Sequence, residues 1–358
     1  MPDWTKSMQQ TYEYFEVDPA TWSNRRKIDN ITSSSITRDV EADTGGSASF
    51  NVSSDLGELY IRTYLVTIQN GITDKTVLGT HLCQTTGDSF DGKVKDISLD
   101  AYGSLLELKE KNPPIGYSLS AGTNILGVAT KLVSENVRAP VVGGEGDYQL
   151  TYPFVAEIED TWFTYITDLL ASIGYKMGVD ELGRVIFVPD QDANSLMPIF
   201  TYEDDDISIL QPDFDVSRDL YGIPNALEVI YNMESGGYLY SKVVNDDPDS
   251  PISTVTRGRE IVQRVTNPEL VDIPSQEEQA QARLNDYAKQ TLRDLSTLEY
   301  TLTYTHGYCP VRVGDCVRIN YRRAGLTNQN AKVIRQNIKC ETGCQVEETA
   351  VYTRSLWR

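Results

Sequence analysis

The sequence SQEEQAQARLNDYAKQTLRDLSTL at residues 275–298, followed by EYTLTYT at residues 299–305, changes its apolar period from that of a helix to that of a strand. Ser275 and Glu278 have the spacing of a capping box, so the helix is predicted to begin at Ser275. Apolar residues then recur at helical spacing, at Ala280, Leu284, Tyr287, Ala288, Leu292 and Leu295. Residues 316–321 read as a further strand. The stretch therefore predicts one long helix that leads into paired strands.

Upstream of this helix, the first 110 residues read as an antiparallel barrel or sandwich. The predicted strands are 35–38, 48–52, 59–69, 76–83 and 95–102. Asn70-Gly71 supplies the positive φ angles of a type I′ hairpin turn between two of them. Within residues 60–65, Tyr60, Arg62 and Tyr64 alternate with Ile61, Thr63 and Leu65. We expect one face of that strand to be buried and the other to be exposed.

The middle of the sequence mixes helix and strand signals. Pro113-Pro114 indicates a boundary, because two prolines continue neither a helix nor a central strand. Thr123 and Asp160 are predicted to cap two short helices. Gly174 is predicted to end the second helix in a left-handed conformation, and a hairpin over residues 175–188 follows. Strand patterns return from about residue 201.

Charge is distributed unevenly along the chain, whose 358 residues carry a net charge of −20. Residues 301–358 hold nine Lys/Arg and four Asp/Glu and are net positive by 5, so the preceding 300 residues carry −25. The overall charge argues against sequence-specific nucleic-acid binding, because phosphate contacts need Lys and Arg. The asymmetry is consistent either with complementary subunit surfaces or with ordinary surface charge that keeps the protein soluble.

The sequence shows no membrane-spanning run of about 18 apolar residues. Its polar N-terminus lacks the apolar core of a signal peptide. We therefore expect no integral membrane segment, and synthesis and assembly in a host cytoplasm.

Four of the five cysteines lie in the last fifty residues, at Cys309, Cys316, Cys340 and Cys344. Their C-x6-C and C-x3-C spacings differ from the tight C-x2-C turns of a zinc knuckle. Three alternatives stay open for them: a metal site, a disulfide in an extracellular particle, and buried free thiols.

Catalytic patterns are scarce, because the chain has only two histidines, His81 and His306. We expect His81 to be packed or hydrogen-bonded within a strand and His306 to make a turn contact at a strand end. The acidic clusters 203–206 and 246–249 read as solvated loops or, less well, as calcium ligands, since neither has EF-hand spacing. We expect no cofactor and no enzymatic activity.

Several short segments of the C-terminal half, taken in order, resemble the tail-tip or baseplate hub proteins of phages. They are Arg257-Gly258-Arg259-Glu260-Ile261-Val262, Thr266-Asn267-Pro268, the helix, Tyr304-Thr305-His306-Gly307-Tyr308, Val313-Gly314-Asp315, Ile338-Lys339-Cys340-Glu341 and Leu356-Trp357. The resemblance implies two related small β-barrels with smaller domains around them.

The expected fold class is mainly β with an α+β insert: two small β-barrels plus an α+β domain and one long helix. The expected domains are an N-terminal β-barrel hub domain at 1–110, an α+β domain at 111–200, and a second β-barrel hub domain at 201–358 that contains the helix 275–298.

The resemblance also implies a structural virion protein, a homotrimeric tail hub that joins the tail tube to the tail tip and forms the ring through which DNA passes. The implied partners are the tail tube protein ring, other tail-tip or fibre proteins and the tape measure protein. We expect the basic C-terminal segment to lie at an interface, with Arg322 and Arg323 as the candidate contact residues.

Two other functions remain as alternatives. One is a tail-associated cell-wall hydrolase, although the chain ends at Arg358 directly after the last predicted strand and we expect no separate hydrolase domain. The other is a tail protein that binds host carbohydrate through exposed tyrosine and tryptophan side chains.

Overall fold

The structure is a computed structural model that describes residues 2–357 except 92–93, 206–207, 234–235 and 269–276. Strands account for 47% of the residues and helices for 16%, so the chain is mainly β. It divides into two compact units. The first comprises Met1–Asp215 and Thr303–Ala350, and the second comprises Val216–Leu302 and Val351–Arg358. No helix in the described ranges is long and apolar enough to cross a membrane.

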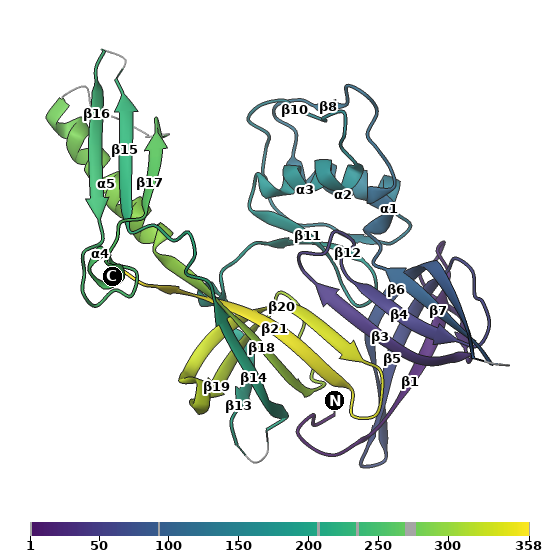
Figure 1. The fold of residues 1–358 in the computed structure, drawn as a ribbon. Coiled ribbons are helices and arrows are strands. Elements are labelled where there is room, and N and C mark those ends of the chain that lie inside the picture. The colour runs from purple at the N-terminus through teal and green to yellow at the C-terminus, as the bar shows by residue number, and fades with distance from the viewer. Residues whose placement is uncertain (1, 92–93, 206–207, 234–235, 269–276, 358) are drawn as a thin grey trace. The chain divides into compact units, whose positions relative to one another are not determined.

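A 13-stranded sheet dominates the first unit (Figure 1). Its N-terminal strands are β1 (Gln9–Val17), β2 (Asn24–Ile28), β3 (Ile31–Asp39), β4 (Ser47–Val52), β5 (Tyr60–Gln69), β6 (Ile72–Asp91) and β7 (Val94–Tyr102). Its later strands are β13 (Pro198–Glu203), β14 (Leu210–Arg218), β18 (Thr297–Gly307), β19 (Cys316–Tyr321), β20 (Leu326–Lys339) and β21 (Gln345–Ser355). The short 3-10 helices η1 (Ala193–Ser195) and η2 (Arg322–Ala324) lie beside β13 and β19 in sequence.

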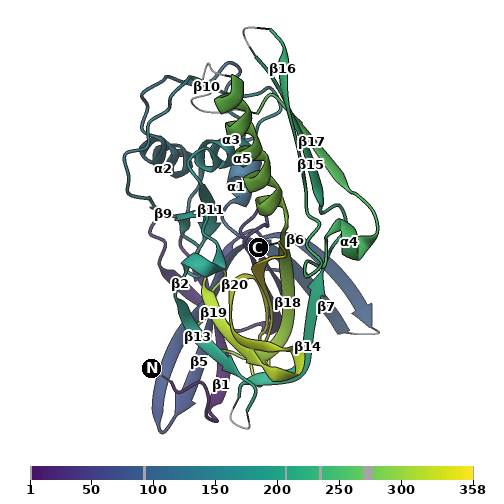
Figure 2. The same ribbon diagram turned by 90° about the vertical axis from the view of Figure 1, so that its left-hand side faces the viewer.

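The two predicted β regions are joined in one sheet, because β3 pairs with β20 from Arg335 opposite Asp39 to Lys339 opposite Ser35. The strand order runs β14-β18-β21-β20-β3-β4-β7-β6-β5-β1-β2, with β19 beside β20 and β13 beside β19. Figure 2 shows β13, β19, β20 and β18 curling around a common centre. Mainly β structure with an α+β insert and one long helix is thus confirmed.

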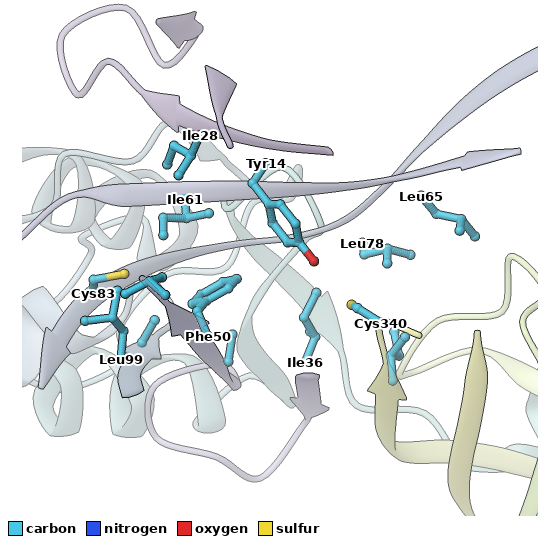
Figure 3. Packing of buried hydrophobic residues seen from close by; sticks show 14 of the residues in the cluster. Tyr14, Ile28, Ile36, Phe50, Ile61, Leu65, Leu78, Cys83, Leu99 and Cys340 are labelled. Carbon is cyan, nitrogen blue, oxygen red and sulfur yellow. The ribbon is translucent and has the colours of Figure 1, made fainter. Parts of the chain in front are cut away.

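One apolar core connects the early and late strands of this sheet. It contains Phe50, Ile61 and Leu99 from the first region together with Ile338 and Val346 from the second. Figure 3 shows Tyr14, Ile36, Phe50 and Cys340 pointing into this common interior. The tight β5–β6 turn is as predicted, since Asn70 and Gly71 both have positive φ.

The prediction of an exposed face on β5 is wrong. Tyr60, Ile61, Arg62 and Thr63 are all buried, because β5 is covered on both sides. Ile61 packs into the main core, whereas Tyr60 packs with Val17 and Leu82 in a second, smaller cluster. Alternation of residue type indicated the two faces correctly but not that the tyrosine face would also be covered.

The α+β part of the first unit has its own core, formed by Leu126, Ile166, Leu170 and further apolar side chains. Its elements are α1 (Leu106–Lys109), β8 (Ser118–Leu119), α2 (Ile125–Asn136), β9 (Val141–Val142), β10 (Phe154–Val155), α3 (Trp162–Ala171), β11 (Tyr175–Val179) and β12 (Val185–Pro189). The 175–188 hairpin is confirmed, and Gly174 has a left-handed φ of 69°.

Each helix cap in this part lies one residue after its predicted position. The side chain of Asn124, not Thr123, accepts a hydrogen bond from the Gly127 backbone. Thr161, not Asp160, forms a capping box with Thr164. Both predicted residues are polar neighbours of the true cap, and sequence alone does not select between adjacent candidates.

The second unit is a three-stranded sheet covered on one face by the long helix (Figures 1 and 2). It contains β15 (Ala226–Asn232), β16 (Tyr238–Val244), α4 (Thr254–Arg257), β17 (Val262–Thr266) and α5 (Glu277–Leu295). The predicted apolar stripe is confirmed: Ala280, Leu284, Ala288 and Leu292 are buried against Leu227, Val229 and Leu239. Ser275 of the predicted capping box lies outside the described residues. The helix ends at Leu295, earlier than the predicted Leu298.

The three-domain division at residues 110 and 200 stays a prediction. The structure adds that α5 packs on β15 and β16, in a compact unit whose segments run from Val216 to Leu302 and from Val351 to Arg358.

Candidate functional site: a buried polar network in the first unit

A cysteine, a histidine and a glutamate, the residue types of a catalytic triad, meet inside the first unit. His306 near the end of β18 places Nε2 3.4 Å from Oε2 of Glu348 on β21. The Sγ atom of Cys309 lies 4.0 Å from the other ring nitrogen, Nδ1. The strands bring these residues together because β18 and β21 are adjacent in the sheet.

The Glu348 carboxylate is fully engaged by neighbouring donors. The hydroxyl of Tyr304 donates to Oε1 at 2.6 Å, and the hydroxyl of Tyr202 donates to the same oxygen at 3.2 Å. The Gln336 amide donates to Oε2 at 2.6 Å. Such a set of hydrogen bonds compensates for the removal of a carboxylate from water.

Both members of the His306–Glu348 pair are shifted toward their charged forms. Burial by itself lowers the pKa of His306, but the contacts with Cys309 and the Glu348 carboxylate outweigh it and raise that pKa to about 10. Burial raises the pKa of Glu348, yet the hydrogen bond and charge of His306, with those of Tyr304 and Gln336, hold it below its ordinary value. The two groups therefore form a buried ion pair.

The burial of this cluster decides what it can do chemically. His306 and Glu348 are each 0% exposed, and Cys309 is 1% exposed. A nucleophilic mechanism needs a substrate atom within reach of the sulfur, and these side chains are sealed inside the sheet. The arrangement therefore serves to hold β18, β20, β21 and β13 in register.

The predicted turn contact of His306 is confirmed in part. Its Nδ1 donates to the Gly307 carbonyl at 2.7 Å, at the end of β18. Its larger role, the ion pair with Glu348, was missed, because the two residues are far apart in sequence and nothing in either segment indicates their pairing.

The network continues from Gln336 to the α+β part of the first unit. Oε1 of Gln336 accepts a hydrogen bond from Arg38 at 3.0 Å. The guanidinium of Arg38 lies 3.6 Å from the Glu181 carboxylate, which Arg312 also approaches at 2.9 Å. Arg38 comes from β3, Glu181 from the β11–β12 turn, and Arg312 from the segment between β18 and β19. Three distant stretches of the chain thus meet around one carboxylate.

A small cavity of about 80 Å³ lies beside this junction and is lined in part by Arg38, His81, Glu181 and Arg312. His81 is buried, as predicted, and its Nδ1 has no hydrogen-bond partner in the described part of the chain. Burial, and then the charge of Arg38, lower the pKa of His81 to about 3. His81 is therefore neutral at physiological pH.

The four candidate cysteines are not brought together as one site. All are buried free thiols: Cys309 lies in the polar cluster, Cys316 points to the Ala193 carbonyl, and Cys340 and Cys344 belong to the main apolar core. Within the described residues, no three Cys, His, Asp or Glu side chains are arranged to hold a metal ion.

The candidate interface residues Arg322 and Arg323 lie in η2, between β19 and β20, and both are exposed. Neither arginine forms an ion pair with a carboxylate of the described residues. The acidic clusters make local hydrogen bonds. The Asp247 carboxylate accepts from the Asp249 backbone N–H and so shapes a turn, and the Glu203 carboxylate accepts from the Asn320 side-chain amide. Asp206 lies outside the described residues.

No protein-family model matches this sequence, and no curated protein is detectably similar to it. Solved structures match almost the whole chain. A tail protein from Neisseria meningitidis MC58 has a TM-score of 0.63 at 15% identity, covering 95% of this chain and 96% of that chain. The 43 kDa tail protein of prophage MuSo2 from Shewanella oneidensis has a TM-score of 0.62 at 12% identity, with coverage of 96% and 98%.

A third match is a chain of the Francisella PdpA–VgrG complex. Its TM-score is 0.53 at 10% identity, and the match covers 99% of this chain but 54% of that one. Because identities this low show a shared fold only, they carry no residue-level roles. The chain has the fold of phage tail proteins, which it shares with part of this VgrG complex.

Proposed function

We propose that this protein is a structural component of a phage tail, a homotrimeric hub between the tail tube and the tail tip that forms a ring for DNA passage. The observation that carries the proposal is the end-to-end fold match with the tail proteins of Neisseria meningitidis and Shewanella oneidensis. The match includes the β regions, the α+β part and the helix-covered sheet, since it spans 95% or more of each chain. That whole-chain likeness supports a structural role in the virion.

The proposed role is not enzymatic. The arrangement nearest to a triad, at Cys309, His306 and Glu348, is buried, and its carboxylate is saturated with donors. The rival function, a cell-wall hydrolase, predicts sustained release of soluble fragments from purified cell walls. Under the structural proposal, incubation of the full chain with such walls releases none beyond the buffer control.

The charge distribution supports assembly through complementary surfaces. The segment 301–358 is net positive by 5, while the rest of the chain is strongly acidic. Opposite surface charges steer subunits together and fix their orientation. We place Arg322 and Arg323 at a contact with a neighbouring subunit or with the tube ring, and the acidic surfaces toward the passage, where they repel the DNA phosphates.

The test is the mass and symmetry of the assembled protein. Light scattering on the full chain, alone and with its tail tube protein, is expected to give three copies per particle, with threefold symmetry in electron micrographs. The double variant Arg322→Glu/Arg323→Glu is expected to lower that mass while the circular dichroism spectrum is kept. The matched control is Arg283→Glu, on the exposed side of α5. A monomer both alone and with the tube protein would contradict the homotrimer. Unchanged assembly of the double variant would contradict the placement of Arg322 and Arg323 at a contact.

A further inference from the structure

The sheet of the second unit has one face buried under α5 and one face open. On the open face, Tyr238 and Tyr240 of β16 lie opposite Asn232 and Ile230 of β15. These four residues line a shallow hollow of about 470 Å³. Tyr238 is 68% exposed and Tyr240 is 44% exposed, so both rings remain accessible on this face.

The strand that carries the two rings is anchored at Tyr240 without a ligand. As residues i and i+2 of one strand, they point to the same side, about 6.8 Å apart along it. The Arg264 guanidinium donates to the Glu228 carboxylate at 2.9 Å, and the Tyr240 hydroxyl lies near the same carboxylate. The Tyr240 carbonyl accepts from the Gln281 amide of α5 at 2.9 Å. Prior anchoring of this kind reduces the ordering cost of binding.

The charged residues described on this face form pairs of opposite sign. Glu228 pairs with Arg264, and Lys242 lies 2.9 Å from Glu260 and 3.8 Å from Glu228. Among the residues of this face that the structure describes, these two positive and two negative side chains leave no net charge to attract a phosphate polymer or an acidic peptide. The hollow is therefore suited to an uncharged ligand.

We propose that this hollow binds a neutral pyranose sugar of a surface polysaccharide. The C–H face of a pyranose ring packs on an aromatic ring, whereas its hydroxyls need paired donors and acceptors. Tyr238 supplies the more exposed of the two rings, and Asn232, opposite it on β15, has a side-chain amide that is both a donor and an acceptor. This binding role goes beyond the proposed hub function and does not depend on it.

A protein partner is the other occupant to consider. The large apolar side chains exposed on this face, within the described residues, are Ile230, Tyr238, Tyr240 and Val262. A stable protein interface takes about 20–30 residues on each side, so this set with its self-paired charges fits a small ligand better.

The experiment titrates the full chain with an array of neutral oligosaccharides built from glucose, galactose, mannose and N-acetylglucosamine, and with 3′-sialyllactose as an anionic probe. At least one neutral sugar is expected to bind saturably and more tightly than the anionic one. Tyr238→Ala is expected to weaken that binding by about tenfold, and Tyr240→Phe, which keeps the ring but removes the hydroxyl near Glu228, by a few-fold. The control Tyr221→Ala, at a 92% exposed tyrosine elsewhere in the same unit, is expected to leave it unchanged.

Three results would overturn the proposal. They are no binding across the neutral array, equal loss in the Tyr238 and Tyr221 variants, or a change in particle mass with Tyr238→Ala while sugar binding is kept. The last result would assign the face to a protein contact. Light scattering on the same samples separates this outcome from failure of the hub proposal, which concerns mass and symmetry alone.

Discussion

The two compact units use their charged residues in opposite ways. In the first unit, His306 and Glu348 are paired at 0% exposure inside the sheet, within a network that reaches Arg38 and Glu181. In the second, the interior is an apolar stripe of α5 on its sheet, and the pairs of Glu228 and Lys242 lie on the open face. Buried pairs are costly to break and fix register, whereas exposed pairs are screened by water and salt. The loss of stability that a substitution causes should therefore differ between the two units in its magnitude, its pH dependence and its salt dependence.

The largest effect is expected for Glu348→Ala. It leaves the His306 imidazolium and two tyrosine hydroxyls buried without their common acceptor, so we expect a loss of about 3–5 kcal/mol in the free energy of unfolding. Denaturant unfolding, with peptide-resolved hydrogen exchange to locate the effect, measures it. The loss of protection should fall on β18 and β21. A loss below about 1 kcal/mol would mean that the pair does not contribute as inferred.

The same pair predicts a pH window. The pKa of His306 is raised from 6.5 to about 10, so its contribution is complete below pH 6.5 and disappears as the pH rises through 10. The pKa of Glu348 is lowered from 4.5, so its contribution is complete above pH 4.5 and is lost on acidification. The stability difference between the wild type and His306→Gln should be largest between about pH 4.5 and 6.5. A difference that is independent of pH would contradict the ion pair.

In the second unit, Leu284→Ala is expected to cost about 2–5 kcal/mol through lost burial and a cavity under α5. Leu284 is completely buried in the apolar cluster. In contrast to the His306 variant, this loss should stay constant between pH 5 and 9, since the contacts that Leu284 makes in the cluster are apolar. Loss of hydrogen-exchange protection in the second unit alone would support the contrast between the two units. An equal loss of protection in both units would contradict it.

A smaller effect is expected at His81. Its pKa is depressed from 6.5 to about 3, so the stability that it contributes is present above pH 6.5 and is lost as the pH falls toward 3. His81→Phe replaces the imidazole with an aromatic ring that does not titrate and removes the buried, unpartnered Nδ1, so it should reduce the acid-induced loss of stability. Unfolding curves at pH 7 and pH 4 measure this. The matched comparison is Tyr221→Phe, which is expected to leave the acid dependence unchanged.

The smallest effect is expected for Lys242→Ala on the open face of the second unit. Its ion pairs with Glu260 and Glu228 are solvent-exposed, and water and salt screen such pairs strongly, so the loss of stability should be small. Raising the salt concentration to about 1 M should abolish the difference from the wild type. A loss as large as that of Glu348→Ala would remove the distinction between the two units.

The sequence by itself determined the local structure. The stripe from Ala280 to Leu292 predicted α5, Asn70-Gly71 predicted its hairpin turn, and the 175–188 hairpin was also found, because helical spacing and turn chemistry act over a few residues. The order of segments around α5 also indicated the tail-hub resemblance, and the fold agrees with it.

Only the tertiary structure decided which distant segments meet. It joined β3 to β20, covered both faces of β5, placed α5 on β15 and β16, and paired His306 with Glu348. It likewise gathered Tyr238 and Tyr240 with Ile230 and Asn232 on an open face. These contacts depend on strand pairing and layer packing between residues tens to hundreds of positions apart, and a local pattern carries no information about its distant partner.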